Sequence, residues 1–297
     1  MAAASAICIV GARGMLGREL VQAYRGRGGT GSAHAVVHEL DVEEMEITDA
    51  GAVASVLKRL RPGLVLNAAA YTDVDGSEAH PDLAARVNAD GAGNLAQACR
   101  DIGCRLVHVS TDYVFDGRGA APYEPGDPVN PQGVYGRTKA DGERRVREAL
   151  GNHAIVRTSW LFGFHGRNFV KTILRLAAER PELRIVADQV GCPTYARDLA
   201  RALVTLADTG RTGTYHFCNA GACTWYDFAG AIVRLGGLAT PIVPITTAEL
   251  GRPAPRPAYS VLSTATLTRD AGIVPRPWTE ALAECVEELR QCGESKG

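Results

Sequence analysis

Tyr135 and Lys139 stand four residues apart in the segment YGRTK, which covers residues 135–139. On a helix this spacing places both side chains on one face, with their Cβ atoms about 5–6 Å apart. A phenol has a pKa of about 10, and a neighbouring ammonium group lowers that pKa because it favours the phenolate. The pair can therefore serve as an acid at neutral pH, although surface pairs with this spacing also arise by chance.

A hydroxyl residue precedes this pair at the end of an apolar run. Thr111 follows residues 105–110, and in a parallel sheet the end of such a strand meets the ligand-binding edge. We therefore predict that Thr111, Tyr135 and Lys139 are the catalytic residues and that Val109 contacts the cofactor beside them.

Three glycines, Gly11, Gly14 and Gly17, follow the first apolar run in a GxxGxxG pattern. Glycines allow a tight turn and a close approach of backbone N–H groups to a pyrophosphate, which the N-terminus of the next helix also attracts. A glycine-rich turn without a ligand would show the same pattern. The predicted dinucleotide contacts of this turn are Gly11, Arg13, Gly14, Met15, Leu16 and Gly17.

Asp41 follows the second predicted strand, where a carboxylate can accept hydrogen bonds from ribose hydroxyls and would repel a 2′-phosphate. Asp41 therefore favours NADH, whereas Arg13 could pair with the phosphate of NADPH. The sequence predicts NADH or NADPH as the cofactor and leaves the choice open. The remaining predicted cofactor contacts are Glu46, Ile47, Ala68, Ala69 and Ala70, together with the catalytic residues Tyr135 and Lys139.

The elements that must position these residues alternate between short apolar runs and longer amphipathic segments. This alternation is typical of a parallel sheet with crossover helices. The expected strands cover residues 6–10, 35–40, 64–67, 105–110 and 153–158. Apolar residues at helical spacing predict helices over 16–24, 50–60, 83–102 and 135–150. The fold class is α/β, with a doubly wound, Rossmann-like parallel sheet.

The regularity weakens after residue 160, where we expect a smaller substrate domain. The predicted dinucleotide-binding domain covers 1–160, and about 193–218 returns to it. The predicted substrate domain covers 161–192 and 219–297 and includes a proline-rich loop at 252–257. Within this half we expect helices at 169–180, 198–208, 225–235 and 278–292 and a strand at 213–218.

Composition excludes several classes of partner. The chain has 32 Lys and Arg against 33 Asp and Glu, and this net charge of -1 favours neither nucleic acid nor an acidic membrane. No apolar run approaches the roughly 20 residues that span a bilayer, and the alanine-rich start, residues 1–5, lacks the basic residues of a secretion signal. The eight cysteines form no CxxC pair, which predicts reduced thiols in the cytoplasm.

The order of glycine turn, hydroxyl and YxxxK pair resembles that of short-chain dehydrogenases, and further strings narrow the likeness. They resemble the dTDP-4-dehydrorhamnose reductase family over nearly the whole chain, most strongly between 64 and 198. The strings are NAAAYT (67–72), VNADG (87–91), STDYVFDG (110–117), RTSW (157–160), DQVGCPT (188–194) and RPAYSVL (256–262).

This resemblance implies a reductase that transfers a hydride from NAD(P)H to the 4-keto group of a dTDP-4-keto-6-deoxyhexose. The expected substrate is dTDP-4-dehydro-L-rhamnose or a related secondary-metabolite sugar, such as one leading to dihydrostreptose. Tyr135 would donate the proton, Lys139 would bind the ribose and lower the pKa of the tyrosine, and Thr111 would polarise the carbonyl. The substrate contacts implied by the family are Thr111, Asp112, Trp160, Asn168, Lys171 and Arg256.

The resemblance also bears on metals and partners. The hydride transfer requires no metal. Some relatives hold magnesium with acidic residues between subunits, but Arg197 stands where one of those acids would fall. Arg197 therefore argues against a metal-bridged dimer, although the sequence leaves open whether one forms, and a homodimer is possible.

Three other functions belong to proteins with a related fold or related motifs. Related dehydratases carry an Asp-Glu pair after the threonine, whereas here Asp112 is followed by Tyr113, which argues against dehydration. An epimerase stays open, because the sequence does not exclude return of the hydride to the sugar. A non-catalytic role also stays open, because the regulatory subunit of methionine adenosyltransferase shares this fold and retains similar motifs.

Overall fold

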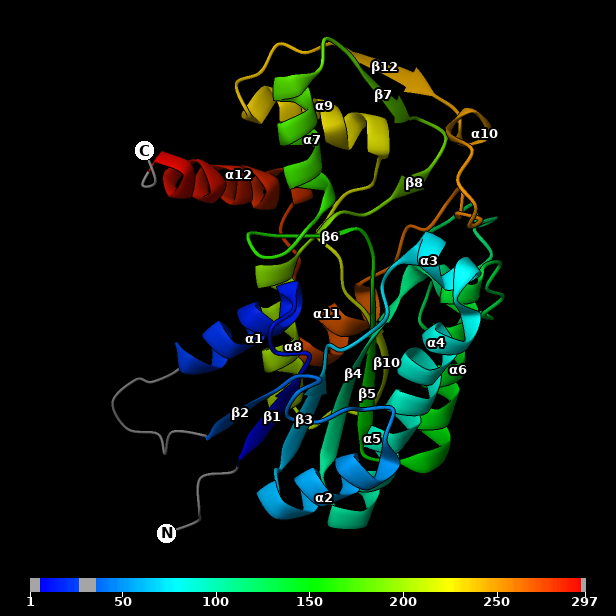
Figure 1. The fold of residues 1–297 in the computed structure, drawn as a ribbon, viewed down its shortest axis with the longest axis vertical. Helices are drawn as coiled ribbons and strands as arrows, with labels where there is room; N and C mark the ends of the chain where they lie inside the picture. Colours follow the sequence, from blue (N-terminus) through cyan, green and yellow to red (C-terminus); the bar gives the residue numbers. More distant parts are fainter. Residues whose placement is uncertain (1–5, 27–35, 295–297) are drawn as a thin grey trace.

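The computed structural model describes residues 6–26 and 36–294, so the alanine-rich start and the first residue of the expected strand 35–40 lie outside it. Its larger part is a six-stranded parallel sheet with the spatial order β10-β5-β4-β3-β1-β2 (Figure 1). The strands are β1 (Ile7–Val10), β2 (Val37–Leu40), β3 (Leu64–Asn67), β4 (Arg105–Thr111), β5 (His153–Thr158) and β10 (Gly213–His216). The predicted doubly wound α/β fold is confirmed.

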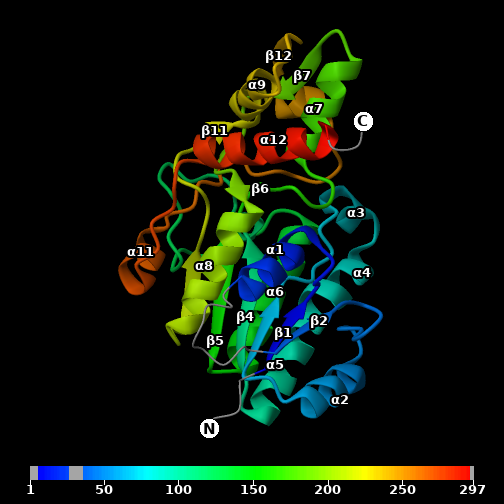
Figure 2. The same ribbon diagram turned by 90° about the vertical axis from the view of Figure 1, so that its left-hand side faces the viewer.

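Helices cover both faces of the sheet. Successive strand residues point to opposite sides and therefore pack against different sets of helices. Ile7 and Ile9 belong to one buried cluster, and Cys8 and Val10 belong to the other. Figure 2 shows α1 and α8 in front of the strands. The first face is covered by α1 (Met15–Arg25), α8 (Ala196–Asp208) and α11 (Ala265–Ala271), and the second by α2 (Ala50–Leu60), α5 (Gly91–Ile102) and α6 (Val134–Ala149).

The order in which the strands follow one another across the sheet reverses at β1, because β2 lies on one side of β1 and β3 on the other. Val10 pairs with Asn67 in the parallel register of β1 and β3, and the N–H of Ala68 donates to the Val10 carbonyl at 2.9 Å. In open α/β sheets the crevice for a ligand lies at such a reversal, beyond the carboxyl ends of the strands. The glycine turn and the alanines after β3 therefore face each other at this crevice.

The predicted helix over 83–102 is interrupted, which corrects the sequence expectation. A π-helical turn, Arg86–Asp90, separates α4 (Pro81–Ala85) from α5, and α3 (Val74–Ala79) precedes both. Within the turn, the Asn88 side chain accepts from the Tyr71 N–H at 2.8 Å and donates to Thr138 Oγ1 at 3.1 Å. Asn88 thus ties the loop after β3 to α6, and π-helical turns of this kind are frequent at functional sites.

The smaller part packs around its own apolar core, which includes Phe162, Ile173, Phe228 and Leu282. It lies above the carboxyl edge of the main sheet in Figure 1. Its elements are β6 (Leu161–Phe162), α7 (Phe169–Glu179), β7 (Leu183–Val186), β8 (Val190–Gly191), β9 (Thr194–Tyr195), β11 (Cys223–Thr224), α9 (Trp225–Leu235), β12 (Ile242–Ile245), α10 (Thr247–Leu250) and α12 (Trp278–Glu294). The domain limits given above stay a prediction.

The cysteines and the helix lengths bear on two further expectations. All eight cysteines lie in the described part of the chain as free thiols, and seven of them are buried. None of the helices within 6–26 and 36–294 is long and apolar enough to cross a membrane.

Candidate active site

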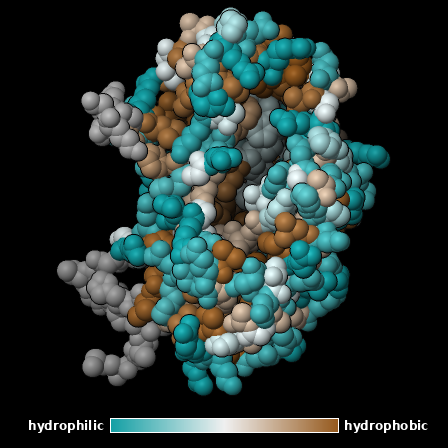
Figure 3. Space-filling model, in the orientation of Figure 1, coloured by the Kyte–Doolittle hydropathy of each residue, from teal (hydrophilic) through white to brown (hydrophobic). Residues whose placement is uncertain are grey.

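A cleft of about 300 Å³ lies at the carboxyl ends of β1, β2 and β3. Where the two parts meet above this edge of the sheet, the face drawn in Figure 3 is hollowed, and apolar residues lie within the hollow. Eight predicted cofactor contacts line the cleft: Gly11, Gly14, Asp41, Glu46, Ile47, Ala68, Ala69 and Ala70. Val10, Val42, Met45 and Val87 also line it, and the sequence analysis did not list them.

The glycine turn leaves space that side chains would fill. Gly11 has a φ of +76°, and a Cβ at this position would lie 2.8 Å from the backbone nitrogen of Ala69. A Cβ on Gly17 would lie 2.0 Å from the Gly11 carbonyl oxygen, so α1 can pack this closely only with glycine. Gly14 is the N-cap residue of α1 and has no side chain to cap it. The first N–H groups of the helix therefore stay available to an anion. These features fit a bound dinucleotide.

Arg13 and Asp41 meet at the rim of the cleft. One Asp41 carboxylate oxygen accepts the Arg13 backbone N–H at 2.9 Å, which fixes the glycine turn. The Arg13 guanidinium pairs with Glu43 and Glu44. Met15 and Leu16 are placed differently from the turn glycines, since Leu16 is buried in the core beneath the sheet, and the Met15 side chain lies near Gly163 of the loop after β6.

Thr111, Tyr135 and Lys139 lie together at the carboxyl end of β4. Tyr135 interacts with the Thr111 hydroxyl, and its ring packs edge-on against Tyr113 with the ring centroids 5.6 Å apart. The Lys139 ammonium donates to the Val109 carbonyl at 2.7 Å. The structure therefore brings together the residues that the sequence predicted from separate segments of the chain.

The pKa values of this group differ from the sequence expectation. Burial raises the pKa of Tyr135 to about 12, and the hydrogen bond between Tyr135 and Thr111 offsets only part of that rise. Burial therefore has a larger effect on this pKa than the Lys139 ammonium, which donates to the Val109 carbonyl. Burial lowers the pKa of Lys139 to about 8, and Glu143 opposes that shift.

Asp112 is the other buried acid beside the catalytic group. The Thr111 hydroxyl donates to its Oδ1 at 3.0 Å. Burial raises the pKa of Asp112 to about 6, although the hydroxyls of Ser260 and Thr111 favour the ionised form. Asp112 therefore changes its charge within the physiological range of pH.

Two interactions hold α6, the helix that carries Tyr135 and Lys139, in place. Glu143 forms a buried ion pair with Arg157 of β5, through hydrogen bonds of 2.9 and 2.7 Å. At the start of the helix, Glu78 of α3 accepts the Val134 N–H at 2.8 Å. The helix that carries Tyr135 and Lys139 is thus fixed to the sheet at one point and to α3 at another.

The remaining predicted substrate contacts come from the smaller part and from the loops beside it. Trp160, in the loop after β5, stacks on Trp225 with the ring centroids 3.6 Å apart. Asn168 caps α7 by accepting the Lys171 N–H at 3.2 Å, and the Lys171 ammonium lies 5.5 Å from the centre of the Phe164 ring. Asn168 and Lys171 therefore make local contacts within this segment of the smaller part.

Arg256 is held by a carboxylate that the sequence analysis missed. Its guanidinium donates to both oxygens of Asp75 on α3, at 3.1 and 2.9 Å, and its pairing lowers the pKa of Asp75. Burial raises the pKa of Tyr113, which packs on Tyr135, and the Arg256 charge opposes that rise, so this pair lies near Tyr135. No spacing in the sequence signals this pair, because its members are 181 residues apart.

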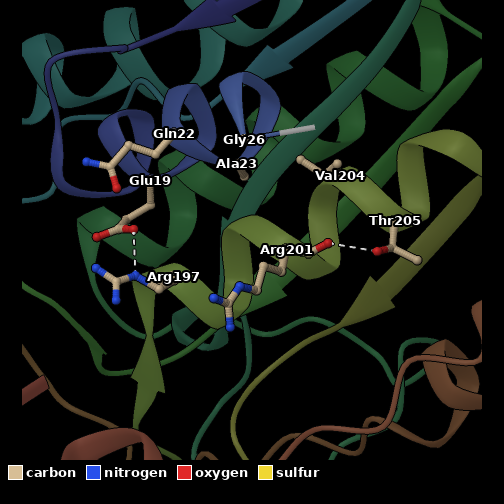
Figure 4. A pocket seen from close by; sticks show the side chains of 8 residues that line it. All are labelled: Glu19, Gln22, Ala23, Gly26, Arg197, Arg201, Val204 and Thr205. Atoms are coloured by element: carbon tan, nitrogen blue, oxygen red, sulfur yellow. Dashed lines mark hydrogen bonds and ion pairs between the residues drawn. The ribbon is translucent and has the colours of Figure 1, made fainter. Parts of the chain in front are cut away.

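Arg197 lies in a second pocket, of about 420 Å³, between α1 and α8 (Figure 4). Its guanidinium meets three carboxylates, those of Glu19 at 3.3 Å, Glu284 at 3.2 Å and Glu288 at 2.5 Å. A cation of the protein itself therefore balances this acidic cluster. The homodimer that the sequence left open stays a prediction.

A doubly wound parallel sheet, a glycine turn at the reversal of the sheet and a Thr-Tyr-Lys group at its carboxyl edge define an extended short-chain dehydrogenase/reductase. Residues 5–291 match the family model described as the RmlD substrate binding domain. The chain is 44% identical to a dTDP-4-dehydrorhamnose reductase of Streptomyces griseus, over 96% of this chain and 93% of that protein. The chain belongs to the dTDP-4-dehydrorhamnose reductase family, as the resemblance in its sequence indicated.

Two solved structures of the same family have nearly the same fold. A dTDP-4-dehydrorhamnose reductase of Clostridium acetobutylicum has a TM-score of 0.92 at 43% identity, covering 96% of this chain and 99% of that one. A dTDP-4-dehydrorhamnose reductase of Bacillus anthracis, in complex with NADP, has a TM-score of 0.90 at 38% identity, with the same coverage. The likeness therefore extends over both parts of the molecule.

Proposed function

We propose that this protein reduces the 4-keto group of a dTDP-4-keto-6-deoxyhexose with a nicotinamide cofactor. The observation that carries the proposal is the meeting of Thr111, Tyr135 and Lys139 beside the cleft of the glycine turn. Membership of the dTDP-4-dehydrorhamnose reductase family supports the choice of sugar nucleotide.

A bound dihydronicotinamide supplies the hydride in this chemistry. Tyr135 supplies the proton: its pKa of about 12 keeps the phenol protonated at neutral pH, ready to protonate the oxygen of the substrate as negative charge develops there. Lys139, four residues along the same helix, stabilises the resulting phenolate and offers its other N–H groups to the ribose of the cofactor.

Thr111 orients the carbonyl and is itself controlled by Asp112. With Asp112 ionised, the Thr111 hydroxyl donates to the carboxylate at 3.0 Å, so its hydrogen is not free for the substrate. When Asp112 carries a proton, that proton can be donated to the Thr111 oxygen, and the threonine hydrogen then polarises the carbonyl. The pKa of about 6 makes both states accessible.

The cleft accepts NADH or NADPH in this proposal. Asp41 offers an acceptor for the ribose hydroxyls, while Arg13 offers a partner for a 2′-phosphate. A phosphate would have to replace Glu43 and Glu44 on the Arg13 guanidinium, which lowers the advantage of NADPH. The NADP complex of the Bacillus anthracis relative supports NADPH as one of the two cofactors.

The test measures oxidation of the cofactor and the configuration of the sugar product in the same reaction. The purified chain is mixed with NADH or NADPH and several dTDP-4-keto-6-deoxysugars, the loss of cofactor absorbance is recorded, and NMR determines the stereochemistry at C4 of the product. We expect stoichiometric oxidation of the cofactor with formation of a 4-hydroxyl, most rapidly with dTDP-4-dehydro-L-rhamnose.

The other functions give different results in this assay. An epimerase would change the configuration of the sugar without net oxidation of the cofactor. A non-catalytic regulatory subunit would bind the dinucleotide and leave every sugar unchanged. Either result would contradict the proposed reduction.

A further inference from the structure

Trp160 has a backbone conformation that side chains of its size rarely adopt. Among the non-glycine residues of 6–26 and 36–294, only Arg61 and Trp160 have a positive φ, of 46° and 47°. Arg61 ends α2, where a left-handed residue is common, but Trp160 lies in the loop between β5 and β6. A bulky residue keeps such a conformation only when its surroundings enforce it, and such residues cluster at ligand sites.

The surroundings of Trp160 explain how this conformation is maintained. Its ring stacks on Trp225, the first residue of α9, with an interplanar angle of 11°. On β8, Gly191 leaves the space that the indole occupies, since a Cβ there would lie 2.6 Å from the Trp160 ring. The Trp160 carbonyl also accepts the Thr194 N–H at 3.2 Å. The ring and the backbone of Trp160 are therefore both held.

Trp225 is in turn anchored by a series of hydrogen-bonded side chains, of which Gln189 is buried. Its indole N–H donates to Gln189 Oε1 at 3.1 Å, and Gln189 is only 4% exposed. The Gln189 amide donates to Thr247 Oγ1 at 2.9 Å, and Thr247 in turn donates to Asp188. Phe169 packs against Trp225, with the ring centroids 4.5 Å apart. Residues 188–191, the DQVG string of the sequence, thus build the support for the two indoles.

We propose that Trp225, fixed by Gln189, is a positioning residue that holds Trp160 as the apolar wall for the deoxysugar. An indole plane suits the C–H face of a hexose that lacks the 6-hydroxyl, and stacking on Trp225 fixes the tilt of that plane. Trp225 thereby selects the sugar through Trp160 and has no part in the hydride or proton transfer. This inference rests on the proposed contact between Trp160 and the sugar.

The first experiment measures binding without turnover. The affinities for dTDP-L-rhamnose and for dTDP are determined by calorimetry in the wild type, Trp225→Ala, Trp225→Phe and Trp160→Ala. We expect Trp225→Ala to weaken binding of dTDP-L-rhamnose about 10-fold and binding of dTDP less than about 2-fold, because only the sugar meets the indole wall. Trp225→Phe should lie between, since a smaller ring keeps part of the stack, and it also serves if the alanine variant does not fold.

The second experiment detects the position of the indoles themselves. Two stacked indoles give an exciton-coupled signal in circular dichroism, and the chain has only three tryptophans. We expect Gln189→Leu, which keeps both rings but removes the anchor, to reduce this signal and to raise KM for the sugar nucleotide with little change in kcat or in KM for the cofactor. Trp278→Phe is the matched control, because Trp278 packs edge-on against Phe228 and should leave the signal and KM unchanged.

The outcomes separate this inference from the proposed function. If Trp160→Ala weakens sugar binding but Trp225→Ala and Gln189→Leu do not, the positioning role is wrong and the proposed function stands. If Trp160→Ala has no effect on dTDP-L-rhamnose, the sugar wall is wrong and the inference falls with it. An unchanged exciton signal in Gln189→Leu would overturn the anchoring of Trp225, whatever the activity of the enzyme.

Discussion

Tyr135→Phe removes a single hydroxyl and tests the assignment of the proton donor. The phenol is the protonated group next to Thr111, with a pKa of about 12, and phenylalanine has no proton to give. We expect kcat to fall by about 10²–10⁴, equivalent to about 3–5 kcal/mol of transition-state stabilisation. The affinity for the cofactor should stay nearly constant, because the ribose contact assigned to Lys139 is untouched.

The fold should tolerate this change. The hydroxyl loses one hydrogen bond, that with Thr111, which corresponds to about 1 kcal/mol of stability and a shift in Tm of only about 2–4 °C. Single-turnover oxidation of NADPH measures the chemical step, and fluorescence titration measures binding of the cofactor. A fall in kcat without a matching loss of affinity would support the role of the donor.

Tyr113→Phe is the matched control for this prediction. Tyr113 loses the same hydroxyl from a ring only 5.6 Å away, but our mechanism gives it no proton to transfer. Its kcat should stay within about 10-fold of the wild type, below the effect of a positioned proton donor. If Tyr135→Phe retains turnover within that range, or if the two variants lose equal activity, the assignment of Tyr135 as the acid is refuted.

Three further predictions follow from the same geometry. Lys139→Met should weaken cofactor binding and lower kcat together. In the wild type, cofactor affinity should fall as the pH rises through about 8, where the ammonium loses its charge. A binding titration of the variant should show no change in affinity across this range. Arg13→Gln should raise KM for NADPH by about 10-fold and leave KM for NADH unchanged, as initial-rate kinetics with both cofactors would determine. Arg157→Met should lower the free energy of unfolding by about 3 kcal/mol at pH 7, because Glu143 loses its buried partner and keeps Arg147, whose side chain is 38% exposed. The pKa of Glu143 is lowered from 4.5 to about 2, so this pair stabilises the fold above pH 4.5 and loses that effect as the pH falls through about 2; urea titrations at several pH values should show the deficit of the variant narrowing over that interval.

Local patterns in the sequence were sufficient to predict the sheet and the meeting of Thr111, Tyr135 and Lys139. Apolar runs separated by amphipathic segments predicted the strands from β1 to β5, because a parallel sheet buries both faces of each strand. Thr111, Tyr135 and Lys139 could be placed together in advance, because the carboxyl ends of parallel strands meet at one edge and an i, i+4 pair shares one helix face. The glycine pattern likewise predicted a tight turn between β1 and α1, where Gly11 has a φ of +76°.

Tertiary structure decided the features that depend on distant segments. The stack of Trp160 on Trp225 and the pairing of Asp75 with Arg256 join residues that no local period relates, so only the folded chain shows them. The pKa of Tyr135 belongs to the same class. Its sequence neighbours predicted a lowered pKa, but burial raises it, because the charged form loses its solvation beside Thr111 and Tyr113. Spacing along the chain determines which groups can meet, and packing determines their partners and their charge.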